Sequence, residues 1–273
     1  MIRLIWQEIK FRKNAIIWWG LGLCFFPIVY LGIYPEVADE MAGLADLEIY
    51  KTMGVSIGGL EEWIGSILIL FVPLLLCIFA IINGTGTIAG EEEDGRLEML
   101  VTLPIPRWQI ITSKALAFSI SSFIILAFVS LVSIPVFEAA NSQMETDLVA
   151  FDVVSAMIST WPLIFAVGMI SMFLASFSAR RLYASLIGAI ILVIGYFGKN
   201  LSGSTKILEP FEPLFIFSYL DNTGKAVTEG QQIEDTIFLL ILGFIAFLLA
   251  VVFFHRRKLT VGAWPWQRSK IDH

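Results

Sequence analysis

Six long apolar runs dominate this chain, and each is long enough to cross a lipid bilayer as a helix. A membrane-spanning helix needs about 20 mostly apolar residues. The runs cover residues 14–34, 63–83, 115–137, 153–177, 182–198 and 236–254. The chain is 57% hydrophobic and only 15% charged, whereas soluble domains carry about 25% charged residues. The sequence therefore predicts an all-α integral membrane protein with six transmembrane helices, folded as one domain over residues 1–273.

The fifth run is the shortest and lies between Arg181 and Lys199. We expect a tilted crossing there; the alternative is a segment that dips into the bilayer and returns. Pro27, Pro73 and Pro162 interrupt the first, second and fourth runs. Neighbouring helices can satisfy the backbone groups that a proline frees, so kinks at these positions are tolerable in a membrane bundle.

The basic residues predict the orientation of the bundle. Placing the N-terminus in the cytoplasm leaves 14 of the 18 lysines and arginines in cytoplasmic segments, which is the bias that membrane proteins show. These 14 are Arg3, Lys10, Arg12, Lys13, Arg96, Arg107, Lys114, Arg180, Arg181, Arg256, Arg257, Lys258, Arg268 and Lys270. Both termini are therefore expected in the cytoplasm, and the even number of spans agrees.

Residues 1–13 predict an amphipathic helix that lies in the headgroup layer. Its apolar positions recur at helical spacing, and cations and a glutamine fill the opposite side. The apolar positions are Ile2, Ile5, Trp6 and Ile9, and the polar ones are Arg3, Gln7, Lys10 and Lys13. A signal peptide is the alternative, but the next apolar run is long and no clear small-residue cleavage site ends it.

An acidic stretch, residues 88–107, separates the second and third runs. Asp94-Gly95 is a turn-forming pair, and Pro104 stops a helix near Leu103. Between them Leu97 and Leu100 share one side of a two-turn helix, with Glu98 on its polar flank. This helix either places Leu97 in a groove of a partner, with carboxylates at the rim, or is a solvated loop.

The same stretch resembles the coupling-helix region of ABC-2 type transporter permeases. The matching residues are Glu91, Gly95, Leu97, Glu98, Leu100, Pro104, Arg107 and Lys114. Arg96 replaces the threonine that is usual there. The match covers the motif closely and the six-span layout loosely.

The resemblance implies that this chain functions together with other subunits. The chain would be the permease of an exporter-like ABC transporter in a prokaryotic plasma membrane. It would pair with a second permease subunit, identical or paralogous, to form the pathway. Cytoplasmic ABC ATPase subunits, which bind the ATP and Mg²⁺, would dock on Glu91, Gly95–Glu98, Leu100, Pro104 and Arg107. Residues 1–13 would be the elbow helix of this family.

The sequence carries no signature of catalysis or of nucleotide binding. It lacks the Gly-x-x-x-x-Gly-Lys-[Ser/Thr] loop that cradles phosphate, so we expect no ATP hydrolysis by this chain. Gly84, Gly86 and Gly90 are interpreted as a flexible span end. His255 and His273 belong to no metal-ligand pattern, and no metal site is predicted. The net charge of −6 and the basic residues at span ends give no sign of nucleic-acid binding.

Two outer features and one serine-rich span complete the prediction. The first two outer loops are acidic, which fits ordinary solvation better than recognition of a cationic substrate. Residues 208–220 are apolar but too short and too rich in proline to span, and they predict an interfacial or re-entrant element before the last span. Serines of the third span, with Gly188 and Gly195 of the fifth, are expected to allow close helix packing. No substrate-contacting residue can be identified.

Two other functions remain open from the residues alone. Ion-driven carriers usually keep ionisable groups at membrane depth, and the six runs hold almost none. A secondary, ion-coupled transporter is nevertheless possible, because discontinuous helices can bind sodium through backbone carbonyls. A membrane scaffold or sensor that transports nothing is the third alternative.

Overall fold

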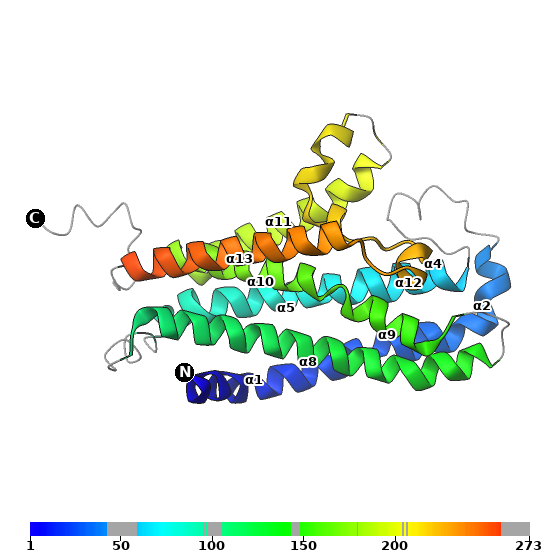
Figure 1. Cartoon of the computed structure of the whole chain (residues 1–273), viewed down its shortest axis with the longest axis horizontal. Helices are drawn as coiled ribbons and strands as arrows, with labels where there is room; N and C mark the ends of the chain where they lie inside the picture. The colour runs from blue at the N-terminus through cyan, green and yellow to red at the C-terminus, as the bar shows by residue number, and fades with distance from the viewer. Residues whose placement is uncertain are drawn as a thin grey trace, which may run out of the picture.

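A computed structural model describes residues 1–42, 59–94, 97, 105–142, 148–178, 180–203, 205 and 207–257. Within them, six helical segments are long and apolar enough to cross a membrane. They are Ile2–Ala38, Leu60–Glu93, Arg107–Asn141, Ala150–Phe177, Arg181–Ser202 and Ile233–Arg256. Each contains one predicted run and extends past it at one or both ends. The chain is therefore an all-helical membrane protein with six candidate spans (Figure 1).

The six spans are built from the following elements. The first comprises α1 (Ile2–Leu23), the π-helical turn η1 (Pro27–Leu31) and α2 (Gly32–Ala42). The second comprises α4 (Leu60–Ile64), the π-helical segment η2 (Gly65–Phe71), α5 (Val72–Thr85), the π-helical turn η3 (Gly86–Gly90) and α6 (Glu91–Glu93). The others are α8 (Arg107–Asn141), α9 (Ala150–Ile158) with α10 (Trp161–Phe177), α11 (Arg181–Ser202) and α13 (Ile233–Arg256).

Each of the three prolines lies where a regular α-helix changes. Pro27 is the first residue of η1, and Pro73 is the second residue of α5, directly after η2. Pro162 is in the first turn of α10, next to the break at Ser159 and Thr160 that separates α10 from α9. A proline lacks the N–H that an interior helical position donates, so the helix widens or breaks at these points.

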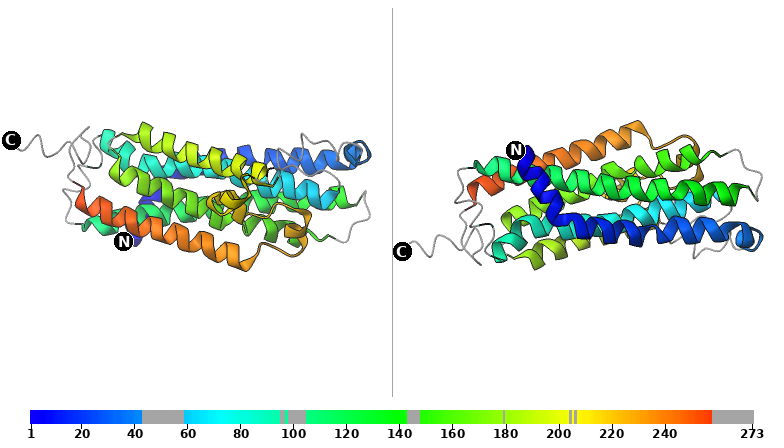
Figure 2. Two further views of the ribbon diagram at one scale, coloured as in Figure 1. Left: turned by 90° about the horizontal axis from the view of Figure 1, so that it is seen from above. Right: turned by 90° about the horizontal axis from the view of Figure 1, so that it is seen from below.

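The second and fourth spans form the centre of the bundle. Their apolar windows are 78% and 61% buried, compared with 28% for the first and sixth spans. α10 packs against α5, α11 and α13, and α1 packs against α8. Figure 2 shows these helices running nearly parallel along one long axis. Large apolar side chains of the outer helices, such as Trp18, Ile194 and Phe244, face outward, as a lipid environment requires.

Buried serines of α8 serve packing, as the sequence analysis expected. Ser121, Ser130 and Ser133 are fully buried, and each hydroxyl donates to a carbonyl of its own helix at 2.6–2.8 Å. Their polar groups are therefore satisfied without a ligand. In α11, Cβ atoms at Gly188 and Gly195 would lie 3.2 Å from Ile81 and 3.0 Å from Ile216, so both glycines permit close contact.

Different elements form the two ends of the bundle. The N-terminus, the starts of α8 and α11 and the end of α13 meet at one end, which we call the N-terminal end of the bundle (Figure 1). The short helices α2, α4 and α12 (Gly224–Thr228) lie at the other end. The first turns of α1 run obliquely across the bundle before the helix turns along it (Figure 2, right). The assignment of residues 1–13 as an elbow helix stays a prediction.

The apolar segment before the last span forms no span of its own, as predicted. It folds into two short 3₁₀ helices, η4 (Glu209–Leu214) and η5 (Ile216–Tyr219). η4 buries no residue, whereas Ile216 and Phe217 of η5 are buried against the bundle. Lys199 at the end of α11 anchors the chain that follows, donating to the Leu220 carbonyl at 2.5 Å and to Asn222 Oδ1 at 2.8 Å.

Candidate functional site

The acidic triplet Glu91–Glu93 ends the second span and forms the centre of the candidate site. The three residues make up α6, directly after η3. Consecutive side chains on a helix leave its axis about 100° apart. The three carboxylates therefore point toward different neighbours, and each contacts a different part of the N-terminal end of the bundle.

Glu91 binds the buried ammonium of Lys114. Lys114 Nζ, on a side chain only 1% exposed, lies 2.7 Å from both carboxylate oxygens of Glu91. It also donates to Glu8 Oε1 of α1 at 2.7 Å. Glu8 Oε2 in turn lies 3.6 Å from Arg12 Nη2. Two carboxylates thus face two cations, and their attraction opposes the cost of removing these charges from water.

Glu92 pairs with Arg257, directly after the end of α13. Both side chains are 5% exposed. The same guanidinium donates at 2.7 Å to the carbonyls of Ala175 and Ser178, at the end of α10. The last carbonyls of a helix have no partner within it. Arg257 therefore caps α10 and also binds α6.

Glu93 binds the start of α11. Its Oε1 accepts a hydrogen bond of 2.8 Å from the backbone N–H of Arg181. An acid at a helix N-terminus satisfies an unpaired N–H and complements the helix dipole. The Arg181 side chain turns back onto the second span and donates to the Ile82 carbonyl at 3.1 Å.

Arg107, the first residue of α8, completes the connections. Its Nη1 donates to the backbone carbonyl of Arg257 at 2.7 Å. A second, longer contact of 3.4 Å reaches the His255 carbonyl. α8 is therefore joined to the end of α13 as well as to α6. We call the interacting residues the charge clamp. They are Glu8, Arg12, Glu91, Glu92, Glu93, Arg107, Lys114, Arg181 and Arg257.

The glycines before the triplet are packed closely, which corrects their interpretation as a flexible span end. A Cβ at Gly84 would lie 2.8 Å from the carbonyl oxygen of Gly168 in α10. Cβ atoms at Gly86 and Gly90 would lie 3.3 Å and 3.2 Å from the Arg181 side chain. The glycines thus let α10 and Arg181 approach the second span.

Three of the predicted coupling residues lie among the described residues. Glu91 and Arg107 are in the charge clamp. Glu91 contacts Lys114 there, which is also a residue of the coupling-region motif. Leu97 is fully buried within the chain, whereas the sequence analysis placed its side chain in a partner's groove. Its role in coupling stays a prediction. The remaining predicted residues fall outside the described residues: Gly95, Arg96, Glu98, Leu100 and Pro104. The predicted helix between Arg96 and Leu103 therefore stays a prediction.

Sequence reasoning missed most of the clamp. It treated Glu8, Glu92 and Glu93 as unremarkable and counted Arg181 and Arg257 only for orientation. One signal was present: Glu8 is the only acid in the basic N-terminal helix, four positions before Arg12, a spacing that favours an ion pair. The second partner of Glu8, Lys114, is 106 residues away, and no local spacing in the sequence indicates this contact.

Other candidate sites are sparse in the described part of the chain. It contains no group of three or more histidine, cysteine or acidic side chains that could hold a metal ion. Two hollows in this part are apolar grooves beside α1, each of about 240 Å³. Neither contains a polar side chain that would define a transported substrate.

Two comparisons with known proteins bear on the family of this chain. A search of curated proteins gave no match to this chain. The family model described as ABC-2 family transporter protein matches residues 2–259, which is nearly the whole chain and includes every residue of the charge clamp. Members of this family are the transmembrane component of an ABC transporter and not its ATPase. The chain belongs to the ABC-2 family of transporter proteins.

Proposed function

We propose that this chain is the permease of an ATP-driven, exporter-like transporter. Two such subunits, identical or paralogous, form the pathway, and cytoplasmic ATPase subunits dock on the region 88–107. Family membership supports the general class. The observation that carries the finer proposal is the attachment of Glu91–Glu93, near the start of the predicted docking region, to the other five spans, directly or through Lys114 and Arg257.

The charge clamp connects this docking region to the other helices of the bundle. Glu91 is joined to α8 and through Lys114 to α1, Glu92 to the ends of α13 and α10, and Glu93 to the start of α11. The ion pairs of Glu91 and Glu92 are largely buried, and buried pairs are electrostatically stronger than exposed ones. The hydrogen bond of Glu93 is exposed. A force on the docking region is therefore passed to the N-terminal end of the bundle as a unit, as alternation between inward-open and outward-open states requires.

The proposal separates two kinds of acidic residue. Glu91, Glu92 and Glu93 hold the permease together, whereas Glu98 is proposed to meet a cation at the rim of the ATPase surface. Charge reversal at Glu98 is therefore the cleaner test of docking, because changes in the triplet also disturb the permease itself.

The test is co-purification with candidate ABC ATPase subunits that are co-expressed with the permease. Glu98→Lys is expected to reduce the ATPase recovered with the permease, because it leaves a partner cation facing a like charge. The loss is on the order of 2–5 kcal/mol if that pair is buried and much smaller if it is exposed. Glu209→Lys, at an exposed position of η4, is the matched control and should bind like the wild type.

Hydrolysis measured in the same preparations distinguishes the alternatives. The permease alone should hydrolyse no ATP. The complex with the ATPase should hydrolyse ATP at a rate that is coupled to transport. If Glu98→Lys binds and couples like the wild type, the acidic stretch only solvates a loop. Transport by the permease without any ATPase would instead favour an ion-coupled carrier, and robust hydrolysis by the isolated chain would exclude the proposal.

A further inference from the structure

We propose that an anionic phospholipid binds along the first span. Lys10 and Lys13 hold its phosphate, and one acyl chain lies in the groove between α1 and α8. The proposal requires that the chain spans a membrane, but it does not depend on the ATP-driven function.

The groove has the shape and chemistry of an acyl-chain site. Its volume is about 240 Å³, and every lining residue is apolar. The lining residues are Ile16, Ile17, Gly20 and Leu21 of α1 with Ile124, Ile125 and Phe128 of α8. Gly20 forms part of the floor, because a Cβ there would lie 3.2 Å from the Phe128 ring. A large side chain at position 20 would therefore fill the groove or displace Phe128.

The cations stand at the head of this groove. Lys13 is three and four residues before Ile16 and Ile17, so it occupies the adjacent turn on the same side of the helix. Lys10 and Lys13 are both exposed. Phosphate groups of anionic lipids attract lysines in this position, next to the hydrocarbon layer.

The rest of the N-terminal helix reinforces this charge. Glu8, its only acid, is turned inward to Lys114 in the charge clamp, so the outward side chains carry positive charge only. Trp6 is 59% exposed, and Lys10 Nζ lies 5.5 Å from the centroid of its ring. Tryptophan and lysine are enriched together at the membrane–water interface, where the ring remains below the phosphates and the ammonium reaches them.

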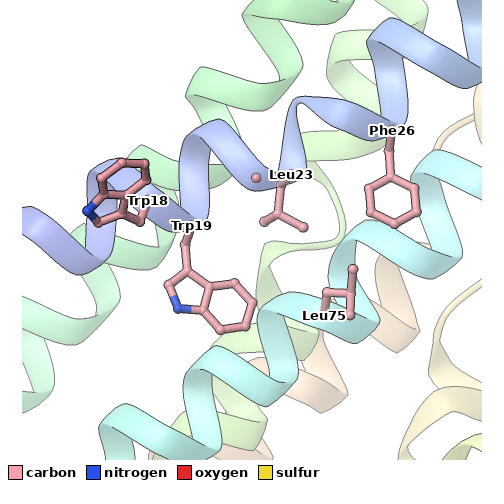
Figure 3. A pocket seen from close by; sticks show the side chains of 6 residues that line it. Trp18, Trp19, Leu23, Phe26 and Leu75 are labelled. Atoms are coloured by element: carbon pink, nitrogen blue, oxygen red, sulfur yellow. The ribbon is translucent and has the colours of Figure 1, made fainter.

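A second groove on the same helix provides an internal comparison. It lies between α1 and α5 and has the same volume of about 240 Å³. Figure 3 shows five of its lining side chains, Trp18, Trp19, Leu23, Phe26 and Leu75. Asn14 and Ala15 lie four and three residues before Trp18, in the adjacent helical turn. Neither is a cation, in contrast to Lys13 beside the first groove. This second groove can take an acyl chain but has no means of selecting an anionic headgroup.

The experiment is native mass spectrometry of the purified chain in detergent, titrated with dioleoylphosphatidylglycerol or dioleoylphosphatidylcholine. The wild type should prefer phosphatidylglycerol. Lys10→Gln with Lys13→Gln should reduce this preference about 25-fold, since each lysine contributes about fivefold near the surface. Binding of phosphatidylcholine, whose choline cation offsets the phosphate charge, should change little, and this shows that the variant is folded. Lys10→Arg with Lys13→Arg keeps both charges and should bind like the wild type.

Two glycine variants test the groove. Gly20→Leu should weaken the binding of both lipids, because it fills the acyl-chain site. Gly22→Leu is the matched control: it lies in the second groove, where a Cβ meets no atom within 4 Å, and it should leave the preference for phosphatidylglycerol unchanged. If the double glutamine variant keeps the wild-type preference, the headgroup assignment is wrong. If Gly20→Leu binds both lipids like the wild type, the acyl chain does not lie in this groove.

Discussion

At the scale of single residues, Lys114 is the most informative position. Its ammonium lies between Glu8 and Glu91 and is screened from water. Glu91 lies past the end of a predicted span, which from the sequence suggested that charge changes there would leave the permease intact. The structure corrects this expectation. Removing one partner of a buried ion pair leaves an uncompensated charge, which costs much more than losing a surface pair.

We therefore predict that Glu91→Ala destabilises the isolated permease by about 3 kcal/mol, because the Lys114 ammonium stays buried with only one carboxylate beside it. Glu209→Ala, at an exposed position, should cost less than about 1 kcal/mol. Unfolding of both variants in mixed micelles, followed by circular dichroism, measures the difference. Equal stability of Glu91→Ala and the wild type would show that the ion pair contributes nothing to the fold.

At the scale of elements, small residues determine how closely the central helices approach. Gly84 of α5 lies against the backbone of α10, so a side chain there would meet atoms that cannot rotate away. Gly22 of α1 has no neighbour within 4 Å of its Cβ position. The two glycines are in helices of the same bundle, and they differ in what a methyl group would contact.

This contrast gives a prediction for alanine substitutions. Gly84→Ala should push α5 away from α10 and destabilise the bundle by about 1–3 kcal/mol, the usual effect of overpacking. Gly22→Ala should be neutral or stabilising by up to about 1 kcal/mol, since alanine favours helix over glycine. Thermal unfolding in detergent compares them. A Gly84→Ala variant as stable as Gly22→Ala would contradict the close contact between the two spans.

At the scale of the whole molecule, the charge clamp marks one end of the bundle and α12 the other. The basic residues predict that the N-terminal end of the bundle faces the cytoplasm. Arg180, directly before α11, and Lys225, in α12, lie at opposite ends. Cys24 and Cys77 are both buried.

Single-cysteine labelling tests this orientation. In a background with Cys24→Ala and Cys77→Ala, an impermeant maleimide should label Lys225→Cys in intact cells and Arg180→Cys only after permeabilisation. The reason is the 14-to-4 division of basic residues between the two sides. Labelling of Arg180→Cys in intact cells would reverse the orientation, and it would place the charge clamp on the side where no ATPase can reach it.

The sequence by itself determined the class of fold and the family. Long apolar runs are a local property, because about 20 consecutive apolar residues favour a spanning helix whatever they later pack against. The changes in helix geometry at Pro27, Pro73 and Pro162 are equally local, since each proline lacks an N–H. The motif from Glu91 to Lys114 was also readable, because its residues lie within 24 positions.

The tertiary structure alone decided what those residues bind. Glu91 is followed directly by Glu92 and Glu93, and nothing in that string indicates that their partners are on α8, at the end of α13 and at the start of α11. Leu97 has the same helical spacing whether it faces a partner or the core, and only packing shows that it is buried. Ion pairs and close contacts join residues distant in sequence, so they depend on how all six spans assemble and not on any one stretch.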